Sequence, residues 1–329
     1  MTAQSPVVLF ALGGTIAMAG GGGAGVVARL TGHDLVGGAS GLDDVPIEVR
    51  DVPAMPSADL TFRDVLDVVE SAGQAITDGA RAIVLTQGTD TLEETAFLVD
   101  SVWSHEAAFV LTGAMRNPTL PGADGPANLV AAMRVACSDA ARRRGALVVF
   151  NDEIHTARFV RKTHSTHTAT FSSPDAGPIG HVVEDVARFL LDVPRRTPIA
   201  GFTEQSMAAT RVALYTVTFD DDGGLLAPVA GTCQGLVVAG FGAGHVPAHL
   251  APVLGELARE IPVVLTSRAG AGSVLDATYG AVGSERDLRD RGLINGGFVH
   301  PYKARVLLRL LVAAGASTAA IADAFAELG

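Results

Sequence analysis

The amino-acid sequence predicts an α/β protein with two domains, and three observations lead to this prediction. The chain has 329 residues, of which 48% are hydrophobic and only 18% are charged, enough to bury more than one core. Short apolar runs rich in valine, leucine and isoleucine recur along it, and helical patterns lie between them. Continuous apolar runs are typical of strands buried on both faces, as in a parallel sheet. Their alternation with helices predicts repeated βαβ units.

The first and larger domain is expected to span residues 1–190. Its predicted strands are "VVLFAL" (7–12), "AIVLT" (82–86), "AFVLTG" (108–113) and "ALVVF" (146–150). Helical patterns between these strands are "FRDVLDVVESAGQAI" (62–76) and "TLEETAFLVDSVW" (91–103). These elements predict a parallel sheet covered by helices, of the flavodoxin or Rossmann-like type.

The apolar start of the chain is interpreted as the first strand of this sheet. It lacks the basic residues that open a signal peptide, and the apolar run breaks at Gly13-Gly14. No apolar stretch approaches the roughly 20 residues that a membrane helix requires. We therefore expect a cytoplasmic protein without a membrane partner.

A segment rich in proline and small polar residues, 191–211, is expected to link the two domains. Beyond it a second series of apolar runs begins: "VALYTVTF" (212–219), "GLVVAG" (235–240) and "PVVLTS" (262–267). This series predicts a smaller α/β domain over residues 212–329.

Charge and glycine patterns argue against two kinds of ligand. With 35 acidic and 24 basic residues the net charge is −11, and no Lys/Arg cluster is long enough to follow a phosphate backbone. Nucleic acid is therefore not expected as a partner. Gly20, Gly22 and Gly25 match the dinucleotide fingerprint, but they lie well past the first strand and open no convincing helix. No cofactor is expected.

The spacing of cysteine and histidine does not favour a metal site. Cys137 and Cys233 are far apart and are interpreted as reduced, buried thiols. His164 and His167 form an H-x-x-H pattern with His155 nearby, but there is no H-E-x-x-H motif and no cysteine partner. The sequence predicts no metal.

Short polar residues and glycines collect where the predicted strands end. The three sets are Gly13, Gly14 and Thr15; Gly88, Thr89 and Asp90; and Thr112, Gly113 and Ala114. Ligands of open α/β sheets bind at the carboxyl ends of the strands. Glycine lets backbone N–H groups approach a substrate, and a threonine hydroxyl becomes a nucleophile when a base lies beside it. The pattern predicts a nucleophile site.

Helix capping is the alternative explanation for the polar residues at 89–91. Thr91 and Glu94 have the spacing of a capping box, and Asp90 is also a good cap. Capping requires only one of these side chains, so it does not account for all of them.

Lysine usage points to the base. Only two of the 24 Lys and Arg residues are lysines, Lys162 and Lys303. Arginine is effectively always protonated, whereas a buried lysine can become neutral and accept a proton. Lys162, in "RFVRKTHSTHTATF", is the better candidate, and an ordinary surface lysine is the alternative.

Two motifs together make the chain recognisable. "GGTIA" (13–17) and "QGTDTLEETA" (87–96) resemble the two threonine signatures of the bacterial-type L-asparaginase family. The similarity extends over nearly the whole chain through "VLTGAMR", "GADGPANL", "FND", the lysine of "VRKTHSTHTATF" and "HPYKARVLL". The resemblance implies an amidohydrolase that cleaves the side-chain amide of L-asparagine to aspartate and ammonia without a metal or cofactor.

The resemblance also implies catalytic roles. Thr15 would be the nucleophile, and Thr89 would be the second threonine, activated by Lys162 with Asp90 alongside. Which threonine attacks first is left open. The N–H groups of the glycine-rich turns at Gly14 and Gly88 would stabilise the oxyanion that forms during attack.

Substrate-binding roles follow from the same resemblance. Ser57 would hold the α-carboxylate of the substrate, and Asp90 its α-ammonium. The carbonyl of Ala114 would accept a hydrogen bond from the leaving amide. From the second domain of a neighbouring subunit, Glu285 would place a negative charge near the ammonium, with His245 close by. A homodimer or homotetramer is therefore expected.

The sequence departs from the family pattern at several positions. Gly25 or Val26 stands at the place of the family's loop tyrosine, and Ala58 follows Ser57 where many relatives carry a hydrogen-bonding side chain. His245 replaces an asparagine. These changes leave open a related amidase for glutamine, D-asparagine or another small amide. A non-catalytic amino-acid-binding protein of the same fold is a further alternative, against which the intact Thr15, Thr89, Asp90 and Lys162 argue.

Overall fold

The computed structural model describes residues 5–20 and 27–328 and divides the chain into two compact units. The first unit ends at Pro198 and the second begins at Ile199, within the segment predicted as a linker. Gly22, Gly25 and Val26, which include the place of the loop tyrosine, lie outside the described residues.

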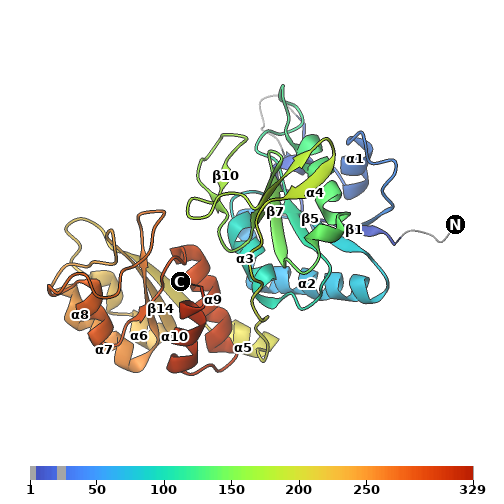
Figure 1. Ribbon diagram of the computed structural model, residues 1–329. Helices are drawn as coiled ribbons and strands as arrows, with labels where there is room; N and C mark the ends of the chain where they lie inside the picture. The colour runs from blue at the N-terminus through green and yellow to red at the C-terminus, as the bar shows by residue number, and fades with distance from the viewer. Residues whose placement is uncertain (1–4, 21–26, 329) are drawn as a thin grey trace. The chain divides into compact units, whose positions relative to one another are not determined.

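A sheet of eight strands organises the first unit, in the order β12-β11-β8-β7-β6-β5-β1-β4. Figure 1 labels β7, β5 and β1 of this sheet. Its parallel part comprises β1 (Val7–Ala11), β4 (Ile47–Asp51), β5 (Ala82–Thr86), β6 (Phe109–Thr112) and β7 (Ala146–Phe150). Every residue of β1, β5, β6 and β7 is buried, as continuous apolar runs require. The predicted α/β class and parallel sheet are confirmed.

Helices cover both faces of this sheet. On one face lie α2 (Phe62–Thr77) and α3 (Leu92–Val102), which contact each other. On the other lie α1 (Gly32–Gly37) and α4 (Gly125–Ala136), which share one hydrophobic cluster with inward residues of β1, β5 and β7 (Figure 1). Loops, rather than helices, lie at the carboxyl ends of the parallel strands.

The antiparallel edge of the sheet was not predicted. It consists of β8 (Glu153–Thr156), β11 (Gly180–Val183) and β12 (Val186–Phe189). Two-residue turns with positive φ at both positions make the hairpins: Asn151-Asp152 joins β7 to β8, and Glu184-Asp185 joins β11 to β12. Such turns match the twist of paired antiparallel strands.

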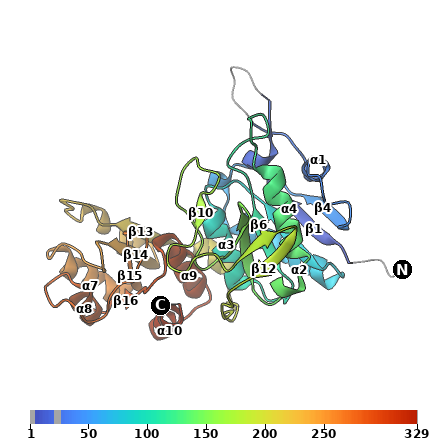
Figure 2. The ribbon, with the colours of Figure 1, turned by 45° about the horizontal axis from the view of Figure 1, so that its top comes forward.

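The second unit contains a parallel sheet of four strands: β13 (Val212–Thr216), β14 (Gly235–Gly240), β15 (Val263–Ser267) and β16 (Ile294–Asn295). Figure 2 shows the strands in this order, with α7 (Leu250–Glu260) and α9 (Pro301–Ala313) on opposite sides. The unit also contains α5 (Glu204–Ala209), α6 (Val229–Thr232), α8 (Glu285–Asp290) and α10 (Thr318–Ala326).

Two pairs of short strands complete the architecture. β2 (Met18–Ala19) pairs with β3 (Val27–Ala28), and β9 (Arg161–Lys162) pairs with β10 (Phe171–Ser172). None of the helices in the described part of the chain has the length and apolar character to cross a membrane. Cys137 and Cys233 form no disulfide and are half-buried rather than buried as expected.

Candidate active site

Two glycine turns meet at the carboxyl edge of the first sheet. The chain leaves β1 through Gly13 and Gly14, with φ of 89° and 90°, and Thr15 then opens a 3-10 turn. A Cβ on Gly14 would lie only 2.3 Å from the backbone nitrogen of Gly88, in the turn after β5. The positive φ and this close approach both require glycine. The turn that carries Thr15 therefore packs directly against the turn that carries Thr89.

Ser57 lies against the same turn. It opens a 3-10 turn, Ser57–Asp59, and it is buried. A Cβ on Gly88 would lie 2.6 Å from the Ser57 hydroxyl oxygen, so Gly88 also has no room for a side chain. The loops that carry Thr15 and Ser57 thus both pack on the turn that carries Thr89.

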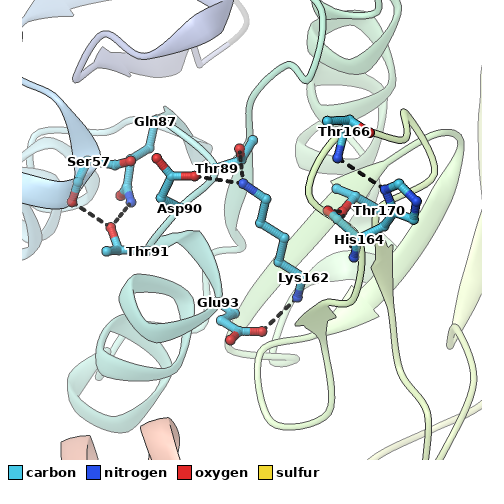
Figure 3. A network of polar contacts seen from close by, with 10 residues as sticks. All are labelled: Ser57, Gln87, Thr89, Asp90, Thr91, Glu93, Lys162, His164, Thr166 and Thr170. Atoms are coloured by element: carbon cyan, nitrogen blue, oxygen red, sulfur yellow. Dashed lines mark hydrogen bonds and ion pairs between the residues drawn. The ribbon is translucent and has the colours of Figure 1, made fainter. Parts of the chain in front are cut away.

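Thr91 holds the Ser57 loop in place rather than capping α3. Its hydroxyl donates to the carbonyl of Ser57 over 2.9 Å and accepts from Gln87 Nε2 over 3.1 Å (Figure 3). Gln87 Nε2 also donates to Thr95 Oγ1 over 3.1 Å. Thr91 is the N-cap residue of α3 but makes no side-chain capping bond. The capping-box explanation was therefore wrong, because the hydroxyl is used for a contact between loops.

Lys162 reaches this turn from β9. Its Nζ lies 2.9 Å from Thr89 Oγ1 and 2.7 Å from Asp90 Oδ1 (Figure 3). The Lys162 side chain is 16% exposed and that of Asp90 is 70% exposed, so the pair opens to solvent on the Asp90 side. An amine in contact with a hydroxyl can exchange a proton with it. Thr89 thus has a potential base within hydrogen-bonding distance.

Glu93 fixes the backbone of Lys162. This buried carboxylate, in the first turn of α3, accepts a hydrogen bond from the Lys162 N–H over 2.7 Å (Figure 3). The residue was not singled out in the sequence, where it reads as an ordinary acidic residue near a helix N-terminus.

Ala114 lies beside Thr89. It is fully buried after β6, and a Cβ on the preceding Gly113 would lie 2.5 Å from the Gln87 carbonyl oxygen and 3.5 Å from Thr89 Cγ2. The turn after β6 therefore packs on the turn after β5. The structure brings together the first-domain residues predicted for the site: Gly14, Thr15, Ser57, Gly88, Thr89, Asp90, Ala114 and Lys162.

Glu285 and His245 belong to the second unit and contact each other there. His245 Nε2 lies 3.2 Å from Glu285 Oε2, and the Tyr279 N–H donates to Glu285 Oε1 over 2.7 Å. Burial alone would raise the pKa of Glu285, but the backbone N–H bonds and the His245 contact outweigh it and hold this pKa below its ordinary value. Glu285 is therefore negatively charged at neutral pH.

The three histidines considered as metal ligands serve other contacts. His155 is buried and lies 2.9 Å from the Ser173 hydroxyl, and His164 Nδ1 accepts N–H groups from Thr166 and His167. Across residues 5–20 and 27–328, no three His, Cys, Asp or Glu side chains gather as metal ligands would.

Comparisons with protein families match both units. A family model described as "Asparaginase, N-terminal" covers residues 6–194, and one described as "Glutaminase/Asparaginase C-terminal domain" covers residues 211–325. The two matches together account for most of the chain.

Individual relatives agree in sequence and in structure. An L-asparaginase of Bacillus licheniformis is 32% identical over 287 residues, which are 86% of this chain and 88% of the relative. A glutaminase-asparaginase of Pseudomonas aeruginosa is 33% identical over 278 residues, 82% of this chain and 76% of the relative. The crystal structure of a probable cytoplasmic L-asparaginase from Campylobacter jejuni matches with a TM-score of 0.88 at 30% identity, covering 98% of this chain and 99% of that one.

Proposed function

The chain belongs to the bacterial-type L-asparaginase family, and on this premise we propose that it hydrolyses the side-chain amide of L-asparagine to L-aspartate and ammonia through a threonine nucleophile. The observation that carries the proposal is the contact of Lys162 Nζ with Thr89 Oγ1, over 2.9 Å, in a turn on which the loops of Thr15 and Ser57 both pack. An amine beside a threonine hydroxyl can move the proton that a neighbouring threonine nucleophile gives up.

The reaction proceeds in two steps. The Thr15 oxygen bonds to the amide carbon, whose oxygen becomes negative and is stabilised by N–H groups of the turns at Gly14 and Gly88. The C–N bond then breaks, and the nitrogen leaves as ammonia with the proton of the hydroxyl. Water hydrolyses the resulting ester, which releases aspartate and restores Thr15. The Thr89–Lys162 pair moves the protons that these steps require.

Charge and hydrogen bonding select the amino-acid part of the substrate. Ser57 binds the α-carboxylate, and Asp90 binds the α-ammonium. Asp90 suits this role because its side chain is 70% exposed and only one of its oxygens contacts Lys162. A carboxylate that binds an ammonium forms a strong, charge-assisted hydrogen bond.

A substrate panel tests this function. We expect the purified protein to release ammonia from L-asparagine faster than from L-glutamine, D-asparagine or a simple amide such as propionamide, because a simple amide lacks both charged groups. Enzyme-coupled detection of ammonia gives kcat/KM for each compound. A higher value for glutamine or D-asparagine would identify the related amidase instead. Calorimetric binding of L-asparagine without any ammonia release would identify a non-catalytic binding protein.

The proposal also includes the oligomeric state of the protein. The active unit is a homodimer or a dimer of dimers, in which the second unit of a neighbouring copy adds Glu285 and His245 to the threonine site. A twofold axis would complete two sites at once. Glu285 supports this role because it is held negative, as recognition of the ammonium requires. The protein works in the cytoplasm, a proposal supported by the Campylobacter jejuni relative, described as probably cytoplasmic.

A further inference from the structure

Asp124 uses its carboxylate on a neighbouring turn instead of on its own helix. It occupies the N-cap position of α4 but makes no side-chain capping bond there. Its oxygens instead accept the N–H of Met115, over 3.0 and 3.1 Å, and the N–H of Arg116, over 2.8 Å. An N-cap aspartate ordinarily accepts an N–H of its own first turn. Asp124 lacks that capping bond, and its carboxylate instead binds the N–H groups of the turn after β6.

Asn128 holds the same turn from the next turn of α4. This side chain is 3% exposed, and its Nδ2 donates to the Gly113 carbonyl over 3.1 Å and to Asp124 Oδ2 over 3.2 Å. Its Oδ1 accepts the N–H of Asn151, over 3.0 Å, in the left-handed turn after β7. Asn128 therefore ties the ends of two neighbouring strands together and orients the Asp124 carboxylate.

These bonds hold the residues on both sides of Ala114 in the chain. The carbonyl of Gly113 and the N–H groups of Met115 and Arg116 all have partners. Over the described ranges, no hydrogen bond engages the N–H or the carbonyl of Ala114, although the residue is fully buried. Buried peptide groups are nearly always paired. The turn lies against Thr89, so a substrate bound beside Thr89 is the candidate partner for these two groups.

We infer that Asp124 and Asn128 are positioning residues that aim the Ala114 carbonyl at the leaving nitrogen of the substrate amide. The inference rests on the proposed hydrolysis of asparagine. A carbonyl held in this way accepts an N–H of the leaving group, and it releases ammonia without moving itself. An oriented acceptor of this kind is effective because its geometry is set before the reaction.

A substrate without a leaving N–H separates this role from a merely structural one. The β-methyl ester of L-aspartate keeps the α-carboxylate, the α-ammonium and the acyl group of asparagine, but its leaving oxygen has no N–H to donate. We expect Asp124→Asn to lower kcat/KM for L-asparagine about tenfold, the order that one misplaced hydrogen bond costs. The same variant should lower kcat/KM for the ester less than about threefold. In Asp124→Asn an NH₂ group replaces one acceptor oxygen and faces the N–H donors of the turn.

The ratio of the two values is measured in one preparation, so it does not depend on the fraction of folded enzyme. Asn128→Leu removes the companion bonds at similar volume and should shift the ratio in the same direction. Asp64→Asn is the matched control, because Asp64 accepts its hydrogen bonds from Thr61, in a capping box at the start of α2. This control should leave the ratio unchanged.

Two results separate failure of the inference from failure of the proposed function. Equal losses on amide and ester, or no loss on either, in both Asp124→Asn and Asn128→Leu would overturn the positioning role while leaving the hydrolase intact. Absence of ammonia release from L-asparagine by the unmodified protein would overturn the proposed function and the inference with it.

Discussion

Replacing Thr89 by valine or Lys162 by methionine should each lower kcat for L-asparagine at least about a hundredfold, since positioned proton transfer contributes on the order of 10²–10⁴. Valine keeps the shape of threonine and removes the hydroxyl that lies 2.9 Å from Lys162 Nζ. Methionine keeps the length of the lysine side chain and removes the amine. Steady-state ammonia release, with circular dichroism to confirm folding, provides the measurement.

Two conservative variants sharpen this test. Thr89→Ser keeps a hydroxyl within reach of Lys162 and should retain much more activity than Thr89→Val. Lys162→Arg keeps the ion pair with Asp90 but cannot give up its proton, so it should be as inactive as Lys162→Met. If Lys162→Arg works well, Lys162 contributes only charge. Near-normal turnover by Thr89→Val would leave Thr89 with a local structural role alone.

A mixture of two inactive variants should recover activity if the site is shared between copies. In a dimer of Thr89→Val and Glu285→Ala chains, one site carries both changes and the other carries neither. Random exchange makes half of the dimers mixed, so about a quarter of the original activity should return. The experiment requires that Glu285→Ala by itself be severely impaired, which is expected because the mutation removes a buried negative charge and frees His245.

The matched control mixes Thr89→Val with Lys162→Met. Both changes lie in the first unit, so every site of a mixed dimer keeps one of them and no activity should return. Subunit exchange is followed with chains of distinguishable mass. Mixed Thr89→Val and Glu285→Ala dimers that stay inactive, or an active species that sediments as a monomer, would contradict the shared site.

The parallel core of each unit could be predicted because its strands have a strong local signal. The run at 82–86 is uniformly apolar and is buried throughout as β5, and the helical pattern at 62–76 closely matches α2. The antiparallel edge lacked such a signal. Its strands are four residues long and partly polar, and their pairing depends on left-handed turns such as Asn151-Asp152. These turns are visible in the sequence only as short polar pairs.

For the site as well, residues with a local sequence signal could be predicted and those without one could not. Glycines and threonines at the strand ends could be predicted because parallel strands bring their carboxyl ends to one edge. Hydrogen bonds between loops that are distant in the sequence could not be predicted. Asp124 has the sequence position of a helix cap, and Thr91 has that of a capping box, yet each bonds to another loop. Local pattern shows what such a side chain can bond, whereas tertiary packing decides which partner it meets.

The most direct test of the threonine mechanism is to look for its covalent intermediate. The protein is mixed rapidly with L-asparagine, quenched in acid during turnover, digested and examined by mass spectrometry. The mechanism predicts an aspartyl ester on the peptide that contains Thr15, and its loss in Thr15→Val. An aspartyl ester on Thr89 would transfer the role of nucleophile to that residue. Continued ammonia release with no aspartyl group on any threonine peptide, under quench conditions that preserve a synthetic aspartyl-threonine ester, would contradict a threonine nucleophile.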